Sequence, residues 1–183
     1  LFTLFRQHFG RDHKYVRPLT GSASNRQYFR LSDDETSCVG VLGVNPDENR
    51  TFIAMAAHFR AQGIAVPEVY AVSEDAVAYI QEDLGDTALF GIVGSEGSEE
   101  LLCRTVRCLP DIQFKGADGF DFSVCHSVCR FDRRLVLFDL NYFKYCFLKP
   151  SGLEFDENRL QDDFERLADD LTSVKTDTFM YRD

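Results

Sequence analysis

Positive charge is scarce in this sequence of 183 residues. Lys and Arg number 20 against 30 Asp and Glu, which gives a formal net charge of −10. Non-specific binding to nucleic acid depends on basic side chains that displace counterions from phosphates, so we expect no nucleic-acid partner. The acidity would suit a cationic substrate, but a well-solvated surface is the simpler explanation.

Cysteines are too irregularly spaced for a disulfide framework or a zinc site. The chain has 6, at positions 38, 103, 108, 125, 129 and 146. Cys125, His126 and Cys129 do not form a paired C-x-x-C motif, and no second pair completes a tetrahedral set of ligands. We therefore expect reduced thiols, a cytoplasmic location and no metal ligands in this chain.

Long apolar runs are also missing. The longest, Leu135–Leu148, contains Asp139, Asn141 and Lys144 and is too short to cross a bilayer. The first residues carry several charges within a short apolar pattern, unlike a signal peptide, so we expect no membrane association. The composition, 44% hydrophobic with 17 Phe, is instead typical of a globular chain with a real core.

Residues 1–84 show the pattern of a small antiparallel sheet. A short amphipathic helix is predicted before Gly10. Asn45 and Pro46 predict the N-cap and first residue of a longer helix that ends near Gly63. Strands are predicted at Val16–Thr20, Arg26–Leu31, Cys38–Val44, Glu68–Val72 and Val77–Gln81.

Residues 85–183 are predicted to be helical. One helix runs from Ser98 to Pro110, and another follows Asp156. Leu135–Leu148 is apolar on nearly every side, which predicts a helix buried within a lobe. The inward faces of the other two are predicted to carry Leu101, Leu102, Val106 and Leu109, and Leu160, Phe164, Leu167, Leu171 and Val174.

The order of these elements is that of a kinase-like N-lobe leading into a helical C-lobe. We predict an α+β, protein kinase-like fold, with a five-stranded antiparallel N-lobe over residues 1–84 and part of a C-lobe over residues 85–183. The chain begins without Met and both ends fall within predicted elements, so we expect a piece of a longer protein.

The segment LTGSASNRQYFR, residues 19–30, resembles the phosphate-covering turn of the aminoglycoside phosphotransferase-like (choline kinase) family. The resemblance covers most of residues 20–86 and the final three residues. It is strongest to the bacterial branch that phosphorylates the anomeric hydroxyl of N-acetylmuramate and N-acetylglucosamine. Small residues let backbone N–H groups approach phosphate oxygens. The resemblance implies nucleotide contacts at Gly21, Ser22, Ser24 and Asn25, and a polar hairpin without a ligand is the alternative.

The strand lysine that normally contacts nucleotide phosphates in kinases is absent. Residues 39–44 contain none, so Glu48 in the following helix has no obvious partner in that strand. The amino-sugar kinase branch is similar in tolerating this loss. Arg26 or Arg30 could supply the positive charge instead, or both could be surface residues of a strand.

The segment AYIQEDLGD, residues 78–86, resembles the hinge between the two lobes in this family. An extended linker exposes backbone groups that can hydrogen-bond the edge of an adenine. The resemblance implies adenine contacts at Gln81, Glu82 and Asp83. The alternative is an ordinary strand exit with acidic capping of the next helix.

The final residues, Tyr181-Arg182-Asp183, resemble the start of the family's catalytic loop with Tyr in place of His. Asp183 would accept the proton of the substrate hydroxyl. The Asn and the metal-binding Asp that should follow are not in this chain. The resemblance therefore implies ATP and Mg²⁺ for the parent protein, while this chain alone is expected to be inactive.

The resulting hypothesis is an ATP-dependent phosphotransferase acting on an alcohol group, with an amino sugar of cell-wall recycling as its small polar substrate. An aminoglycoside, choline or another small alcohol remains open as the acceptor. Two other classes are open as well: a kinase-like regulatory domain that binds a nucleotide or protein without catalysis, and an α+β interaction module. Oligomeric state is not predicted.

Overall fold

The computed structural model describes residues 1–20, 25–126, 129–174 and 177–180. Gly21, Ser22, Ser24 and Asp183, which belong to the predicted nucleotide and catalytic sites, lie outside the described residues.

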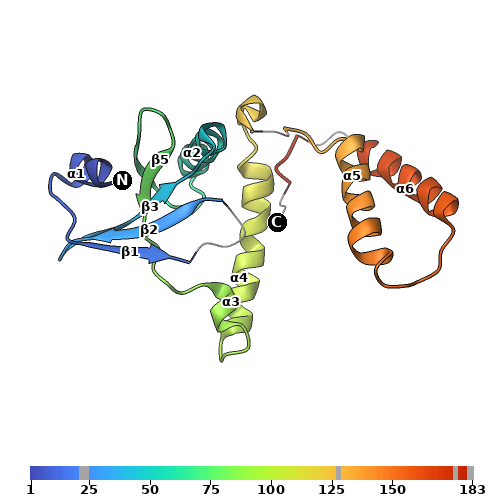
Figure 1. Ribbon diagram of the computed structural model, residues 1–183, viewed down its shortest axis with the longest axis horizontal. Coiled ribbons are helices and arrows are strands. Elements are labelled where there is room, and N and C mark those ends of the chain that lie inside the picture. Colours follow the sequence, from blue (N-terminus) through green and yellow to red (C-terminus); the bar gives the residue numbers. More distant parts are fainter. Residues whose placement is uncertain (21–24, 127–128, 175–176, 181–183) are drawn as a thin grey trace.

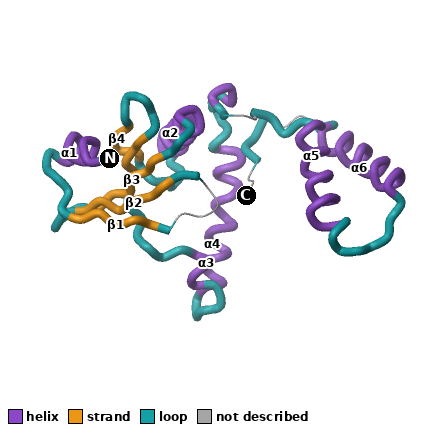
Figure 2. Tube along the Cα trace, viewed as in Figure 1, coloured by secondary structure: helices purple, strands orange, loops and turns teal. Residues whose placement is uncertain are grey.

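A five-stranded antiparallel sheet dominates the first half of the fold (Figures 1 and 2). The strand order is β1-β2-β3-β5-β4. All the predicted strands are present, with ends that differ from the prediction by at most two residues. Their bounds are β1 Tyr15–Leu19, β2 Gln27–Ser32, β3 Ser37–Leu42, β4 Val69–Val72 and β5 Ala78–Glu82.

Each face of the sheet is covered by one helix. The first, α1 (Phe2–Phe9), buries Leu4 and Phe5 against a face that includes Leu31 and Ile80. On the other face, α2 (Pro46–Ala61) packs Phe52 and Ile53 against a core that contains Val39, Val41 and Tyr79. The alternation of buried side chains along β3 and β5 explains how two apolar clusters share one thin sheet.

The predicted start of α2 is confirmed. Asn45 is the N-cap, and its side-chain oxygen accepts hydrogen bonds from the backbone N–H groups of Asp47 and Glu48. Pro46 occupies the first helical position, where its missing N–H costs nothing. Gly63 follows the helix with a φ of 73°, in the left-handed region that glycine favours. The inserted helix therefore begins and ends on local signals.

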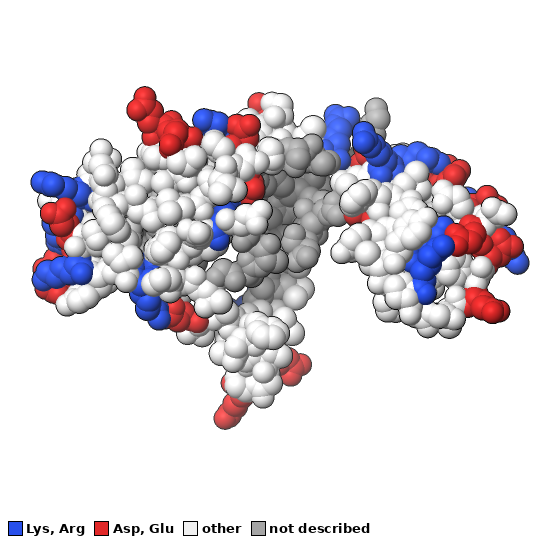
Figure 3. All heavy atoms as spheres, viewed as in Figure 1, with Lys and Arg blue, Asp and Glu red and all other residues white. Residues whose placement is uncertain are grey.

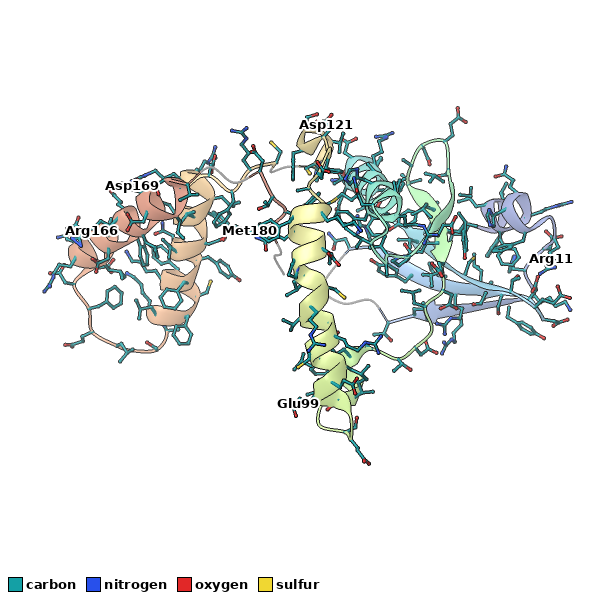
Figure 4. All side chains as sticks on the ribbon, turned by 180° about the vertical axis from the view of Figure 1, so that it is seen from behind. Arg11, Glu99, Asp121, Arg166, Asp169 and Met180 are labelled. Carbon is teal, nitrogen blue, oxygen red and sulfur yellow. The ribbon has the colours of Figure 1, made fainter. Side chains whose placement is uncertain are left out.

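Ion pairs outside the candidate site close the end of the sheet at the β2–β3 turn. Arg11 donates hydrogen bonds to Asp33, to Glu35 and to Thr36. Figure 4 shows Arg11 at the end of the sheet that is remote from α4. On the face shown in Figure 3, basic and acidic side chains are interspersed rather than gathered into one basic surface.

The second half of the described chain is helical, as predicted. The bounds are α3 Leu89–Ile92, α4 Ser98–Pro110, the π-helical turn η1 Asp111–Lys115, the 3-10 turn η2 Phe122–Val124, α5 Arg133–Phe143, the π-helical turn η3 Lys144–Leu148 and α6 Glu157–Thr172. No helix among the described residues is long and apolar enough to span a membrane.

The predicted inward faces of this half are wrong in part. Leu101, Leu102 and Val106 of α4 are exposed, and α4 contains no buried residue. On α6 only Phe164 and Ala168 are buried, while Leu167 and Leu171 are exposed. Apolar periodicity identifies a face but not the neighbour that covers it.

The segment Leu135–Leu148 is helical but not buried on every side, so that prediction is also wrong. Only Val136 and Lys144 within it are buried. Figure 1 shows α5 and α6 as a pair that lies apart from the sheet. A single neighbouring helix covers one stripe of α5, which leaves its other faces exposed. The exposed aromatic residues of this segment are Phe138, Tyr142, Phe143, Tyr145 and Phe147.

Candidate functional site

A pocket of about 340 Å³ lies where β5 leaves the sheet. We call it the 81–86 pocket, because residues 81–86 form one wall. Its volume is at the lower end of the range for small-molecule sites. The opposite walls come from β1 through Leu19 and from β3 through Val39. The described residues that line it are Leu19, Thr20, Arg30, Val39, Pro67, Gln81, Glu82, Asp83, Leu84, Gly85 and Asp86.

A larger hollow of about 470 Å³ lies at the start of α5. The described residues that line it are Asp132, Arg133, Arg134 and Leu137, which all come from one short stretch of chain. The 81–86 pocket, with walls from several strands, is the better candidate for a binding site.

Residues 83–88 cross from β5 toward α3 without forming a helix or strand. Among the described residues, no group accepts a hydrogen bond from the backbone N–H of Leu84. The side chain of Leu84 is 68% exposed, so this N–H group does not lie beneath a packed apolar core. Among the described residues, the segment therefore offers one backbone donor without a partner beside the pocket.

The side-chain amide of Gln81 has a buried oxygen beside the pocket. Gln81 lies directly opposite Val39 in the β3–β5 pairing, and both residues line the pocket. Its Oε1 is buried and has no hydrogen-bond partner among the described residues. A buried, unpaired carbonyl oxygen is costly, which makes Gln81 a candidate contact for a ligand that donates a hydrogen bond.

Unlike the side-chain oxygen of Gln81, the carboxylate of Glu82 has partners within the protein. It accepts a hydrogen bond from the backbone N–H of Glu68 and lies 3.7 Å from Arg60 Nη1. These partners belong to the entry to β4 and to α2. The backbone N–H of Glu82 also donates to the carbonyl of Glu68, at 2.8 Å, so this donor and the side chain both hold the edge of the sheet.

Arg30 and Asp83 form a closed ion pair across one end of the pocket. Arg30 Nε and Nη2 donate to the two carboxylate oxygens of Asp83 at 2.6 and 2.7 Å, and Nη1 donates to Asp86. Ser37 Oγ also donates to Asp83. The hydrogen bond from Arg30 is the main reason that the pKa of Asp83 falls to about 2. Both predicted site residues thus line the pocket, but their charges neutralise each other.

Arg26, one of the two arginines proposed from the sequence to replace the strand lysine, forms an ion pair with Glu48. Its Nη2 lies 2.9 Å from Glu48 Oε1 and donates to the backbone carbonyl of Glu48 at 3.3 Å. Its guanidinium carbon lies 5.7 Å from the centre of the Phe52 ring. An arginine and a helix glutamate therefore form an ion pair like the one that a strand lysine and a helix glutamate form in protein kinases. The strand β3 itself carries no lysine, and its residue Val41 is fully buried.

The Arg26–Glu48 ion pair and the 81–86 pocket lie on the same face of the sheet. Phe52, beneath Arg26, stacks on Tyr79, which belongs to the same apolar cluster as Val39 of the pocket. Asn25, the remaining predicted contact within the described residues, is exposed at the bend before β2. The fold thus gathers Arg26, Arg30, Gln81 and Asp83 on one side.

Asn49 is a site residue that sequence reasoning missed. It is fully buried on α2, next to Glu48, and its Oδ1 accepts a hydrogen bond from Arg26 Nε at 3.3 Å. A single polar residue in a helix gives no local signal of this role, because most such residues face solvent.

Among the described residues, no group of three or more His, Cys, Asp or Glu side chains could hold a metal ion. No family model matches the chain, and no curated protein matches it in sequence.

Proposed function

We propose that this chain is the nucleotide-binding portion of a cytoplasmic, ATP-dependent small-molecule phosphotransferase that acts on an alcohol group, in the first instance a hydroxyl of an amino sugar. The observation that carries the proposal is the 81–86 pocket, where apolar walls from β1 and β3 face a crossing segment with a free backbone donor. A flat heteroaromatic base fits such a site, because its faces need apolar contact and its edge needs backbone hydrogen bonds.

The Arg26–Glu48 pair supports the proposed phosphoryl transfer. It holds the guanidinium of Arg26 at the start of α2. In sequence, Arg26 follows directly after the segment whose resemblance implies phosphate contacts. Phosphoryl transfer depends on positive charge held against the phosphates. In the proposed reaction, Arg26 binds the phosphates and Asp183, outside the described residues, accepts the proton of the attacking hydroxyl.

The magnesium that accompanies ATP is assigned to no described residue. The described residues offer no set of ligands for it, and phosphoryl transfer requires its charge. The proposal therefore concerns the parent protein, and the chain alone is expected to bind nucleotide without turnover.

The experiment is phosphate transfer from ATP, catalysed by the complete protein, to N-acetylmuramate, N-acetylglucosamine, an aminoglycoside and choline. A phosphorylated amino sugar supports the full proposal, and a different phosphorylated alcohol corrects the acceptor. Absence of product with every acceptor would contradict an enzymatic role.

A second candidate is a kinase-like regulatory domain that binds nucleotide without catalysis. The observation in its favour is the valine-rich β3, which has no lysine and buries Val41 at its centre. Tight ATP binding combined with no transfer to any acceptor would favour this candidate over the enzyme.

A further inference from the structure

Asn49 joins three separate parts of the chain through one buried amide. Its Nδ2 donates to the backbone carbonyl of Gly43, at 3.2 Å, and to that of Ala76, at 2.8 Å. Gly43 follows β3, and Ala76 lies in the turn between β4 and β5. Because both carbonyls need a donor, the amide nitrogen serves them, and the amide oxygen is left to accept from Arg26. The orientation of Asn49 is thus set by the sheet.

The guanidinium of Arg26 is consequently held from two directions. Glu48 contacts Nη2, while the oxygen of Asn49 accepts from Nε at 3.3 Å. A pair held only through Nη2 could rotate about that contact, but a second acceptor at Nε fixes the plane of the fork. The side chain of Arg26 is only 15% exposed, so its remaining freedom is small.

Gly43 leaves the room that Asn49 occupies. A Cβ at Gly43 would come closest to Asn49 Oδ1, the atom that accepts from Arg26, and would lie 2.6 Å from Nδ2 and 2.9 Å from Cγ. Asn49 is fully buried and cannot swing into solvent to relieve this contact. A larger residue at position 43 would therefore push the amide away from its carbonyl partners and from Arg26.

We propose that Asn49 is a positioning residue for nucleotide phosphates, which acts by fixing the plane of the Arg26 guanidinium, and that Gly43 is required for it to do so. This inference rests on the proposed function, since it assumes that Arg26 faces the phosphates of ATP. It assigns separate roles to two parts of the site. The 81–86 pocket binds the base, and the Asn49–Arg26 contact orients the guanidinium that binds the phosphates.

The experiment compares the affinities of the complete protein for ATP and for adenosine by calorimetry. Adenosine has the base and sugar but no phosphate, so it reports on the pocket alone. Loss of a hydrogen bond that orients a charged group should weaken ATP binding about tenfold in Asn49→Ala and Gly43→Ala. Adenosine binding should change by less than about twofold, within the range of a surface substitution.

Gly40→Ala is the matched control for Gly43→Ala. Gly40 is also in the β3 region, but a Cβ there would meet Leu1 at 3.0 Å and Leu31 at 3.2 Å, on the α1 face. It should lower stability without changing the ratio of the two affinities. In the Arg26→Gln background, Asn49→Ala should cause no further loss of ATP affinity, because the group it positions is gone.

Arg26→Lys provides a second test in case the Asn49 variants do not fold. Lysine keeps the charge but has no Nε donor for Asn49, so it should weaken ATP binding as much as Asn49→Ala does. Equal losses for ATP and adenosine in the Asn49 and Gly43 variants would overturn the inference, as would an undiminished effect of Asn49→Ala in the Arg26→Gln background. A wild-type protein that binds neither ligand would instead refute the proposed function itself.

Discussion

Arg30 on β2 and Asp83 beyond β5 lie 53 positions apart in sequence, yet they form a two-point ion pair with N–O distances of 2.6 and 2.7 Å. The pair ties the crossing segment to the middle of the sheet. It therefore fixes the wall of the 81–86 pocket that carries the free N–H of Leu84.

Asp83→Asn should destabilise the protein by about 3 kcal/mol, because it leaves the nearly buried Arg30 with only its exposed partner Asp86. Asp86→Asn is the control. The Asp86 side chain is 66% exposed, so its removal should cost less than about 1 kcal/mol. Urea unfolding of both variants measures the difference, and equal costs would contradict the role assigned to Asp83.

The contribution of Asp83 should also depend on pH. Its pKa is lowered to about 2 in the folded protein, below the usual value of about 3.9 for an aspartate. The folded state therefore binds the proton less readily than the unfolded state, and the stabilisation is complete above about pH 4. It should fade as the pH falls toward about 2. Urea midpoints of the wild type and Asp83→Asn, compared across this range, should converge at the acidic end, and a constant gap would argue against the ion pair.

Leu84→Pro tests the backbone donor of the pocket. Proline has no N–H, so the variant should weaken adenosine binding at least about tenfold if that group contacts the base. Leu84→Ala keeps the N–H and, because the leucine side chain is largely exposed, should bind adenosine as the wild type does. Calorimetry on folded protein decides, and similar affinities in both variants would show that the donor is not used.

Asp183→Asn tests the proposed proton acceptor. Removal of a general base should lower the turnover of the complete protein by about 10²-fold or more, while ATP affinity should stay close to that of the wild type. Steady-state rates with an amino sugar and a separate measurement of ATP binding separate the two effects. Unchanged turnover would remove Asp183 from the mechanism.

Phe179→Ala should destabilise the protein by about 3 kcal/mol. Phe179 is 9% exposed and packs its ring against Phe59 of α2 and against Phe120 and Phe122. Its backbone N–H also donates to the carbonyl of Gln113. Phe90→Ala, at a side chain that is 93% exposed, is the control and should leave the urea midpoint unchanged. A small effect of Phe179→Ala would show that residues 177–180 are not anchored to α2.

The end of β5 near the candidate site could be predicted from the sequence, whereas the ion-pair partners of its charged residues could not. The segment 78–86 could be identified because an apolar strand followed by polar, glycine-containing sequence marks an exit from a sheet. By contrast, Arg26 and Arg30 were equivalent candidates in sequence, since both belong to the same predicted strand. The structure separates them: Arg26 contacts Glu48, and Arg30 contacts Asp83 and Asp86.

The order of strands and helices and the start of α2 at Asn45 follow from local sequence signals, because periodicity and capping act over a few neighbouring residues. The burial of Asn49 between Gly43, Ala76 and Arg26, and the exposure of the aromatic residues of α5 and η3, became apparent only in the folded chain. Ion-pair partners and burial depend on which distant elements meet, and no local pattern carries that information.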